Sequence, residues 1–343
     1  MTSRPGFLSP HVQVAAIAQA LREPADPGQA LRQLVQAGCD QLPLPGSGAT
    51  LARWQALACV AVADLSLVKL YEGHTDAMAI LAELGAATLA VPGTRWGVWC
   101  AEPPDYRVTL HMNADGTARL QGVKAWCSGA ASVSHALVSA WNAAGEPCLA
   151  AVALEQPGVT VTQDGWHAVG MRGSASVNVV FDDAVCTPVG EPGAYVNRPG
   201  FQHGGAGVAA CWFGALVRIA QTLRAATPAQ SADPHRLAHL GAIDVTLVQA
   251  RAVLRETAAA IDAAPADSCT LACARARLAV EAAATDIVTR AGRALGAGPL
   301  CRDAGFARVM ADLPVFIRQS HAERDQAALG RLVREQEDNP WQL

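Results

Sequence analysis

The chain has 343 residues, of which 51% are hydrophobic and 16% charged, with a formal net charge of -4 and a pI near 6.1. A chain of this length and composition buries a large core, which excludes a disordered protein. The mild negative charge gives no attraction to phosphate backbones or anionic membranes, so neither nucleic acid nor a membrane is an expected partner.

The N-terminus lacks the positive, apolar and small-residue order of a signal peptide. The longest apolar run, Gly204 to Val217, is shorter than the roughly 18 residues that a membrane-spanning helix needs. We therefore expect a cytoplasmic protein in which this run is a buried helix. No second Cys or His pair stands at ligand spacing near Cys269 and Cys273, so no metal site is predicted.

Residues from about 12 to 89 have the apolar periodicity of helices. The period changes to two after Val91-Pro92-Gly93, and residues 108–112 alternate before the turn sequence Asn113-Ala114-Asp115-Gly116. Further short strands are predicted at 136–140, 148–154 and 177–181, and the sheet is expected to end near Pro192-Gly193.

From Gly204 to Val333 the sequence is Ala-rich and helical. Breaks are predicted at Thr227-Pro228, Asp233-Pro234 and Gly296-Ala297-Gly298-Pro299. The order of elements predicts an α+β fold. Its expected domains are a short N-terminal helical domain (1–92), a central antiparallel β domain (93–195) and a C-terminal helical bundle (196–343).

Three segments resemble the acyl-CoA dehydrogenase family. Gly122-Val123-Lys124-Ala125-Trp126-Cys127-Ser128 resembles its signature of a Gly, a Lys and Trp-x-Ser/Thr. Trp99-Cys100-Ala101-Glu102-Pro103 looks like its Thr-Glu-Pro loop, and the segment from Gly170 to Val185 resembles its Gly-x-Arg…Phe-Asp-Asp-Val segment. The resemblance covers most of the chain. It implies a C-terminal four-helix bundle and an FAD held between the last two domains and across a subunit interface.

The resemblance assigns flavin contacts to the ends of two predicted strands. Trp126 would pack by the isoalloxazine, and the hydroxyl and N–H of Ser128 would contact N5. The cofactor-binding residues expected here are Trp99, Cys100, Ala101, Trp126, Cys127 and Ser128. Fixed donors at these positions would stabilise the charge of a reduced flavin. The alternatives are a sheet-capping aromatic for Trp126 and a turn hydroxyl for Ser128.

A second group of cofactor contacts is expected in the C-terminal region. The segment from Arg293 to Gly298 looks like the family's Gln-x-x-Gly-Gly-x-Gly turn, with Arg293 replacing the amide. Gly296 and Gly298 would let backbone approach the FAD of a neighbouring subunit closely, although a helix C-cap is the alternative. Arg293 and Arg324 are expected to bind its pyrophosphate.

The family's catalytic glutamate, which removes the α-proton of an acyl thioester, has no counterpart here. Its position falls on Ser320, and an alternative position used by some members falls near Gln202. We expect His203 and His321 to face each other and to supply a displaced base, because a neutral imidazole is a competent base near pH 7. Glu323, predicted three residues along the same helix as Ser320, is a further candidate. For both His321 and Glu323 the alternative is a surface or interface position on a solvated helix.

Three functions follow from the resemblance. The first is FAD-dependent α,β-desaturation of an acyl thioester or related small molecule, with a displaced base and an electron acceptor that the sequence does not identify. The second is a flavin-dependent monooxygenase on the same scaffold. The third is a catalytically silent relative that acts as a binding or assembly partner. A homodimer or homotetramer is expected in each case, with the Gly204–Val217 helix offering a surface to bury.

Overall fold

The computed structural model describes residues 10–22, 25–229 and 233–342. Its helices are α1 (Pro10–Ala20), α2 (Pro27–Gln36), α3 (Thr50–Ala63), α4 (Leu65–Glu83), α5 (Ala194–Asn197), α6 (Gly200–Ala225), α7 (Pro234–Ala263), α8 (Thr270–Leu295), α9 (Ala297–Arg302), α10 (Ala304–Phe316) and α11 (Glu323–Arg334). Its strands are β1 (Trp96–Trp99), β2 (Val108–Met112), β3 (Ala118–Cys127), β4 (His135–Trp141), β5 (Pro147–Ala153), β6 (Val159–Val161) and β7 (Val177–Pro188). The predicted order of helices, strands and helices, and with it the α+β class, is confirmed.

The chain divides into two compact units. The first takes residues up to Leu44, then Ser66–Ala168 and Arg172–Phe201, and so contains the sheet. The second takes Pro45–Leu65, Val169–Met171 and the chain from Gln202 on. Each unit therefore draws on segments that lie far apart in the sequence.

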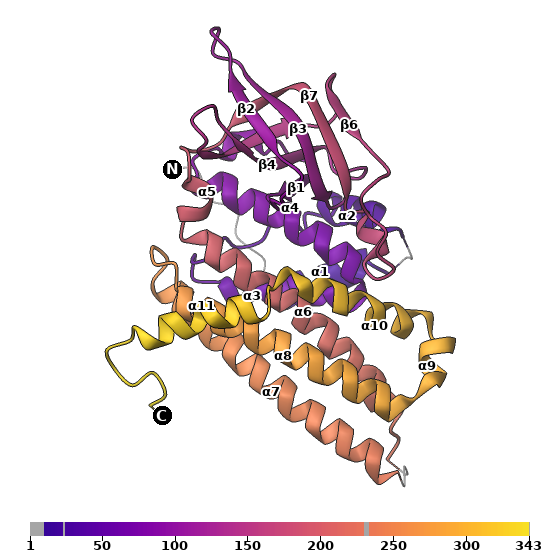
Figure 1. Ribbon diagram of the computed structural model, residues 1–343. Coiled ribbons are helices and arrows are strands. Elements are labelled where there is room, and N and C mark those ends of the chain that lie inside the picture. The colour runs from indigo at the N-terminus through magenta and orange to yellow at the C-terminus, as the bar shows by residue number, and fades with distance from the viewer. Residues whose placement is uncertain (1–9, 23–24, 230–232, 343) are drawn as a thin grey trace. The chain divides into compact units, whose positions relative to one another are not determined.

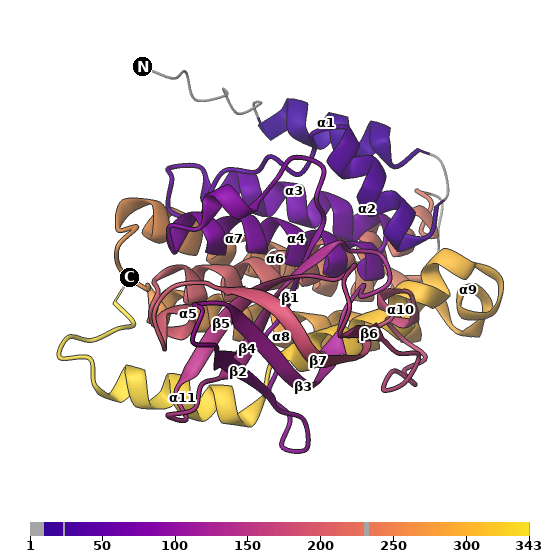
Figure 2. The same ribbon diagram turned by 90° about the horizontal axis from the view of Figure 1, so that it is seen from above.

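The sheet of the first unit has the strand order β1-β4-β2-β3-β7-β5, with β6 on β7 and an additional β4–β5 pairing. Figure 2 shows β6 beside β7. Most pairs are antiparallel, as expected, but β1 and β2 each pair with β4 in parallel. The predicted antiparallel sheet therefore includes two parallel pairings, both with β4. A parallel pair needs a long connection, and the β2–β3 hairpin supplies one between β1 and β4.

The predicted turn between β2 and β3 is confirmed. Asn113 N donates to Thr117 O at 2.8 Å, and the Asp115 carboxylate accepts from Thr117 N at 2.9 Å. Gly116 has φ +83°, a conformation that glycine adopts without steric cost.

Helix α4 lies against the sheet in the first unit (Figure 1). Ala77, Ile80 and Leu81 share one face of the helix because they are three and four residues apart. They pack on a buried cluster of sheet side chains that includes Trp96 and Leu137. This packing fixes β1, the strand that leads into the predicted flavin loop.

In the second unit, α7 and α8 run side by side (Figure 1). Asp233 caps α7 by accepting from the amides of residues 235 and 236, and Gly296, with φ +65°, ends α8. Both breaks were predicted. The break between α7 and α8, at residues 264–269, was not.

Helix α6 is buried, as predicted for the run from Gly204 to Val217, but it is longer than that run. Both α6 and α7 are long and apolar enough to cross a membrane by length and composition. In α6 the apolar window is 67% buried inside the protein, as in the core helix of a globular domain. In α7 the corresponding window is only 17% buried.

The helix expected to run through Ser320 and Glu323 is interrupted. Pro314 removes one amide donor from the last turn of α10, which tightens into a 3-10 turn at Ile317–Gln319. Ala322 has φ +47°, and α11 begins at Glu323. Ser320 and Glu323 therefore do not share a helical face.

Candidate functional site

The exposed indole at the end of β3 is the most prominent feature of the predicted flavin site. The pairing of β3 with β7 shifts register between Lys124 and Cys127. Trp126, inside this irregularity, has φ +58° and is 52% exposed. A bulky residue held in this conformation is strained, and such strain is most common at functional positions. The bulge turns the indole outward from the strand and leaves it able to stack on a planar ring.

Three serine hydroxyls form a chain of hydrogen bonds that begins at Ser128, two residues after Trp126. Ser128 Oγ is 2.8 Å from Ser176 Oγ, which is 2.9 Å from Ser174 Oγ. The Gly129 amide, adjacent to Ser128, donates to Ser174 O at 2.7 Å. Hydroxyls both donate and accept, so this chain of three adapts its polarity to a partner group.

Trp99 and Cys127 support this end of β3 from inside. Both are buried, at 2% and 0% exposure. Trp99 Nε1 donates to Ser128 O at 3.2 Å, which ties β1 to the turn after β3. A Cβ on Gly97 would lie 2.6 Å from Trp99 Nε1, so only glycine leaves room for the indole. Because both side chains are buried, they can act on a ligand only by holding this end of β3 in place.

A buried ammonium fixes the loop that follows β1. Lys124 is 1% exposed, and its Nζ contacts Glu102 Oε1 at 2.5 Å and Ser139 Oγ at 2.7 Å. Trp141 Nε1 donates to Glu102 Oε2 at 3.2 Å. Burial alone would raise the pKa of Glu102, but these hydrogen bonds and the Lys124 charge outweigh it and lower the pKa. The sequence motifs contained both Lys124 and Glu102 but gave no sign that they pair.

Cys100 and Ala101 lie between Trp99 and this ion pair. Burial raises the pKa of the Cys100 thiol to about 11, although nearby Lys124 and a hydrogen bond with Tyr195 act in the opposite direction. Burial also raises the pKa of Tyr195 well above its ordinary value. Both groups stay protonated at neutral pH, so Cys100 acts as a packing group and not as a thiolate nucleophile.

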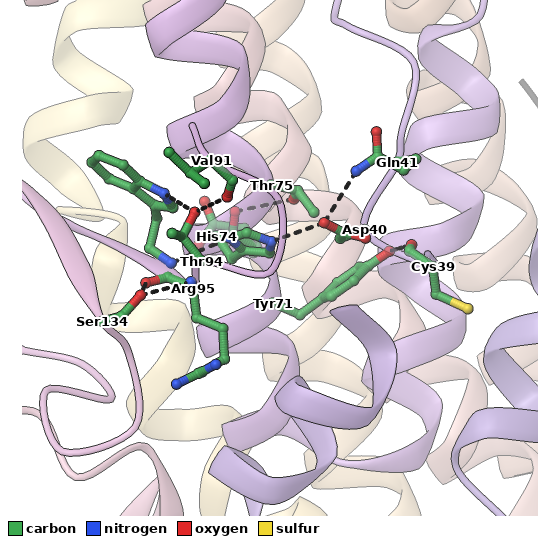
Figure 3. Close-up of polar contacts among 12 residues, drawn as sticks. Cys39, Asp40, Gln41, Tyr71, His74, Thr75, Val91, Thr94, Arg95 and Ser134 are labelled. Carbon is green, nitrogen blue, oxygen red and sulfur yellow. Dashed lines mark hydrogen bonds and ion pairs between the residues drawn. The ribbon is translucent and has the colours of Figure 1, made fainter. Parts of the chain in front are cut away.

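A buried His–Asp pair, which the sequence did not reveal, lies under β1. Figure 3 shows His74 directed toward Asp40, with 3.2 Å between Nε2 and Oδ2. His74 Nδ1 accepts the Trp96 amide at 3.2 Å, which places the ring proton on Nε2. His74 is 1% and Asp40 8% exposed. Since both ring nitrogens are occupied, the pair holds β1 on α4 and has no lone pair for a substrate.

In the second unit lies Ser320, the position to which the sequence resemblance assigned the catalytic carboxylate. It is 3% exposed, and its hydroxyl donates to Glu281 Oε2 on α8 at 2.5 Å. Arg318 binds the other oxygen of Glu281, also at 2.5 Å. Asp325 on α11 accepts from the His321 amide at 2.9 Å. The network joins α8 to the turn before α11 and presents no carboxylate at position 320.

The three candidate bases each have contacts of their own. His203 is 2% exposed and its Nε2 donates to Asp267 O at 2.9 Å. His321 is 63% exposed in its side chain, and its Nδ1 lies 3.6 Å from Asp325 Oδ1. Glu323 is exposed at the start of α11 and lines a hollow of about 570 Å³ between α8 and α11, together with Glu281 and Arg318. Each imidazole is thus engaged by a different group.

The predicted phosphate contacts are on the surface of the second unit. Arg293 and Arg324 are exposed, and neither forms an ion pair within the described part of the chain. Nothing lies within 4 Å of a Cβ added at Gly296 or Gly298. In the described ranges, no three His, Cys, Asp or Glu side chains are grouped closely enough to hold a metal ion.

The chemistry of the residues at the end of β3 in the first unit fits a flavin ring. An isoalloxazine needs a planar apolar neighbour and hydrogen-bond donors near N5 and its pyrimidine edge. Trp126 supplies an exposed indole, and Ser128 supplies a hydroxyl held by Ser176. The residues expected to bind the phosphates of the cofactor are in the second unit. They are two exposed arginines, Arg293 and Arg324, and the open turn at Gly296.

No family model matches the chain. One curated protein, the amino sugar nitrososynthase DnmZ of Streptomyces peucetius, is 42% identical over 113 residues. This match covers 29% of the present chain and 27% of DnmZ, so the chain spans about a quarter of that relative's length.

Solved structures match over nearly the whole chain. TdsC from Paenibacillus sp. A11-2, solved with FMN and indole, has a TM-score of 0.80 at 20% identity and covers 96% of each chain. KijD3, solved with FMN and a dTDP-linked amino-keto sugar, has a TM-score of 0.81 at 22% identity, over 98% of this chain and 96% of its own. The methanesulfinate monooxygenase MsuC from Pseudomonas fluorescens has a TM-score of 0.80 at 18% identity, over 95% and 97%. The chain therefore has the acyl-CoA dehydrogenase-like fold of these structures.

Proposed function

We propose that this protein is a flavin-dependent monooxygenase that oxidises a small molecule at a nitrogen or sulfur atom. The observation that carries the proposal is the hydrogen bond from Ser320 to Glu281. Desaturation of an acyl thioester requires a positioned base for the α-proton. Position 320 has a serine whose hydroxyl donates to Glu281, and position 202 has a glutamine. Neither position therefore supplies a carboxylate base.

The relatives support the same chemistry. TdsC is described as a dibenzothiophene monooxygenase, MsuC as a methanesulfinate monooxygenase and DnmZ as an amino sugar nitrososynthase. All three names imply oxidation at sulfur or nitrogen, and a nitrogen or sulfur lone pair does not need a carboxylate base for activation. This is why α,β-desaturation, with His203, His321 or Glu323 as a displaced base, is the less favoured function.

The proposed cofactor is a reduced flavin, which supplies two electrons to O₂ so that one oxygen atom enters the substrate and the other leaves as water. Trp126 would stack on the ring, and Ser128 would hydrogen-bond its N5 edge, while the Lys124–Glu102 pair keeps the loop containing Cys100 and Ala101 in place. FAD, with Arg293 and Arg324 on its pyrophosphate, remains our expectation from the sequence. FMN is the form bound in TdsC and KijD3 and is the first to test.

His321 of the second unit is our candidate for proton transfer. Its side chain is solvent-accessible, and its Nδ1 lies 3.6 Å from Asp325 Oδ1. His203, held on the Asp267 carbonyl in a buried position, is better suited to a fixed hydrogen-bonding role.

We further expect the protein to be cytoplasmic. All ten cysteines are free, and none is paired in a disulfide, as in a chain kept in a reducing compartment.

The proposal is tested by incubating the protein with chemically reduced FMN or FAD under ¹⁸O₂, with a panel of aryl sulfides, sulfinates and amino sugars. A product that carries one ¹⁸O atom supports a monooxygenase. Bleaching of bound oxidised flavin by an acyl-CoA under anaerobic conditions would instead establish a dehydrogenase. If the protein binds neither FMN nor FAD, both enzymatic functions are excluded and the catalytically silent binding or assembly partner is favoured.

A further inference from the structure

A small cavity of about 140 Å³ lies in the second unit, between the end of α3, α6 and the first part of α10. Its apolar lining includes Leu65 and Val309, and its charged lining consists of two arginines and two aspartates. An apolar cavity of nearly this volume holds one benzene molecule, so the space suits a ligand of about six to eight non-hydrogen atoms. None of the residues that we assign to flavin binding or to proton transfer lines this cavity.

Asp312 forms the acceptor end of the cavity. It is 3% exposed, and its Oδ1 accepts from Met171 N at 2.5 Å. Within the described residues, the other oxygen, Oδ2, has no hydrogen-bond partner. Burial raises the pKa of this carboxyl, as expected for an acid that has no cation beside its second oxygen. A buried acceptor without a donor costs free energy, so this end of the cavity favours a ligand that brings an N–H group or a positive charge.

Arg218 forms the donor end. Its Nη1 donates to Val62 O at 3.0 Å, and a Cβ added at Gly305 would lie 2.5 Å from its Nη2. Glycine at this position therefore leaves room for the guanidinium beside α10. Arg218 forms no ion pair in the part of the chain that the structure describes, and Asp303, next to this end, accepts from the Phe306 amide at 3.0 Å. Nη2 can thus bind a carboxylate, and the start of α10 adds the positive end of the helix dipole.

The two ends lie along the same side of α10. Gly305 and Asp312 are seven residues apart, which is two helical turns and roughly 10 Å along the helix axis. Val309 lies between them on this side and is 5% exposed. The two remaining charged groups, Asp64 and Arg308, neutralise each other in an ion pair of 3.3 Å. The cavity therefore has a donor at one end, an acceptor at the other and an apolar wall between them.

We propose that this cavity binds a small amino acid whose ammonium and carboxylate are separated by a short methylene chain. The carboxylate accepts from Arg218, the ammonium donates to Asp312 Oδ2, and the methylenes lie against Val309. γ-Aminobutyrate, with about seven non-hydrogen atoms, has the size that the volume admits.

Other classes of ligand satisfy only one end. A simple carboxylate leaves the second oxygen of Asp312 without a donor, and a simple amine leaves Arg218 without an anion. A metal cation would lie close to two guanidinium groups, which repel it. A ligand with one charge of each sign pairs both ends and leaves the net charge of the cavity unchanged. This inference does not depend on the proposed enzymatic activity.

The test is calorimetric titration of the full chain with γ-aminobutyrate. We expect saturable binding, and at least about tenfold weaker binding of butyrate and of propylamine, because each lacks one of the two charged ends. 2-Aminobutyrate is the matched ligand control, since it has the same atoms and charges but places both charges at one end. It should also bind at least about tenfold more weakly.

Three substitutions locate the binding. Arg218→Met should weaken the binding of γ-aminobutyrate by at least about tenfold and change that of propylamine by less than about twofold. Asp312→Asn should weaken γ-aminobutyrate similarly and spare butyrate. Gly305→Ala places a methyl group against Arg218 and should weaken binding, whereas Gly292→Ala on α8, where nothing lies within 4 Å of the added Cβ, is its matched control. Circular dichroism verifies that each variant is folded.

Four results would overturn the proposal. One is the absence of any heat of binding up to about 10 mM γ-aminobutyrate. Another is equal affinity for 2-aminobutyrate, which would show that the two ends do not act together. Unchanged affinity in folded Arg218→Met and Asp312→Asn proteins would place the binding elsewhere. Binding of Ca²⁺ alone that Asp312→Asn abolishes would assign the cavity to a metal ion.

Discussion

The hydroxyl of Ser320 donates to the carboxylate of Glu281, across the junction between the last 3-10 turn and helix α8. Glu281 also binds Arg318, so one buried carboxylate receives two donors from the same turn. These contacts order the segment before α11 and give Ser320 a structural role. An acid in the place of Ser320 would oppose Glu281 at this distance and repel it.

Replacing Ser320 by Ala should destabilise the protein by about 1–3 kcal/mol, because Glu281, itself only 7% exposed, would lose a hydrogen-bond donor in a buried position. The change is measured as the free energy of unfolding in urea. Thr289→Val is the control, since the Thr289 hydroxyl bonds only the Thr285 carbonyl of its own helix. If both substitutions lowered the free energy of unfolding equally, the Ser320–Glu281 hydrogen bond would stabilise the protein no more than a hydroxyl bond within a helix.

Removing either partner of the Lys124–Glu102 pair should have unequal effects. Glu102→Leu leaves a 1% exposed ammonium without its carboxylate, whereas Lys124→Met leaves a carboxylate that is 34% exposed and can be hydrated. We expect a loss of about 3–5 kcal/mol for Glu102→Leu and a smaller one for Lys124→Met. Urea unfolding of both variants decides the order, and a larger loss for Lys124→Met would contradict this account of the pair.

Replacing Trp126 by Gly should separate stability from flavin binding. Glycine relieves the strain of φ +58° but increases the entropy of the unfolded chain, so the free energy of unfolding should change by less than about 1 kcal/mol. Loss of the stacking surface should weaken flavin binding by about fivefold to tenfold, measured by quenching of flavin fluorescence. Trp341→Ala, at a residue 77% exposed, is the control and should leave flavin affinity unchanged.

Asp312 should make stability depend on pH. Its Oδ1 accepts from Met171 N at 2.5 Å, and burial, together with the charge of Asp64, raises the pKa of its carboxyl above 3.8 despite that hydrogen bond and nearby Arg308. Because the folded state binds this proton more tightly than the unfolded state, Asp312 costs stability above its folded pKa. That cost disappears as the pH falls below 3.8.

The Asp312→Asn variant keeps an oxygen acceptor for the Met171 amide but does not titrate. Its melting temperature relative to wild type should therefore rise as the pH increases from about 4 to 7. Thermal melts across this range provide the measurement, and taking the difference cancels groups common to both proteins. A difference that stays constant, or falls with pH, would show that burial does not dominate at Asp312.

The sequence by itself determined the order of elements, since alternation at 108–112 and apolar periodicity in the helices depend only on which faces are buried. It also located the turn at Asn113–Gly116 and the helix boundaries at Asp233 and Gly296, where capping and positive φ are local properties. Through the family resemblance, the motif around Trp126 also predicted a flavin contact, which stays a prediction.

Only the tertiary structure decided what those residues contact. The pairing of Lys124 with Glu102, of His74 with Asp40 and of Ser320 with Glu281 joins positions 22, 34 and 39 residues apart. No local pattern encodes such distances, because they arise from strand order and helix packing. For the same reason, the sequence did not reveal that the apolar window of α7 is only 17% buried. A periodic apolar helix shows in its sequence which sides are apolar, but not which of them its own chain will cover.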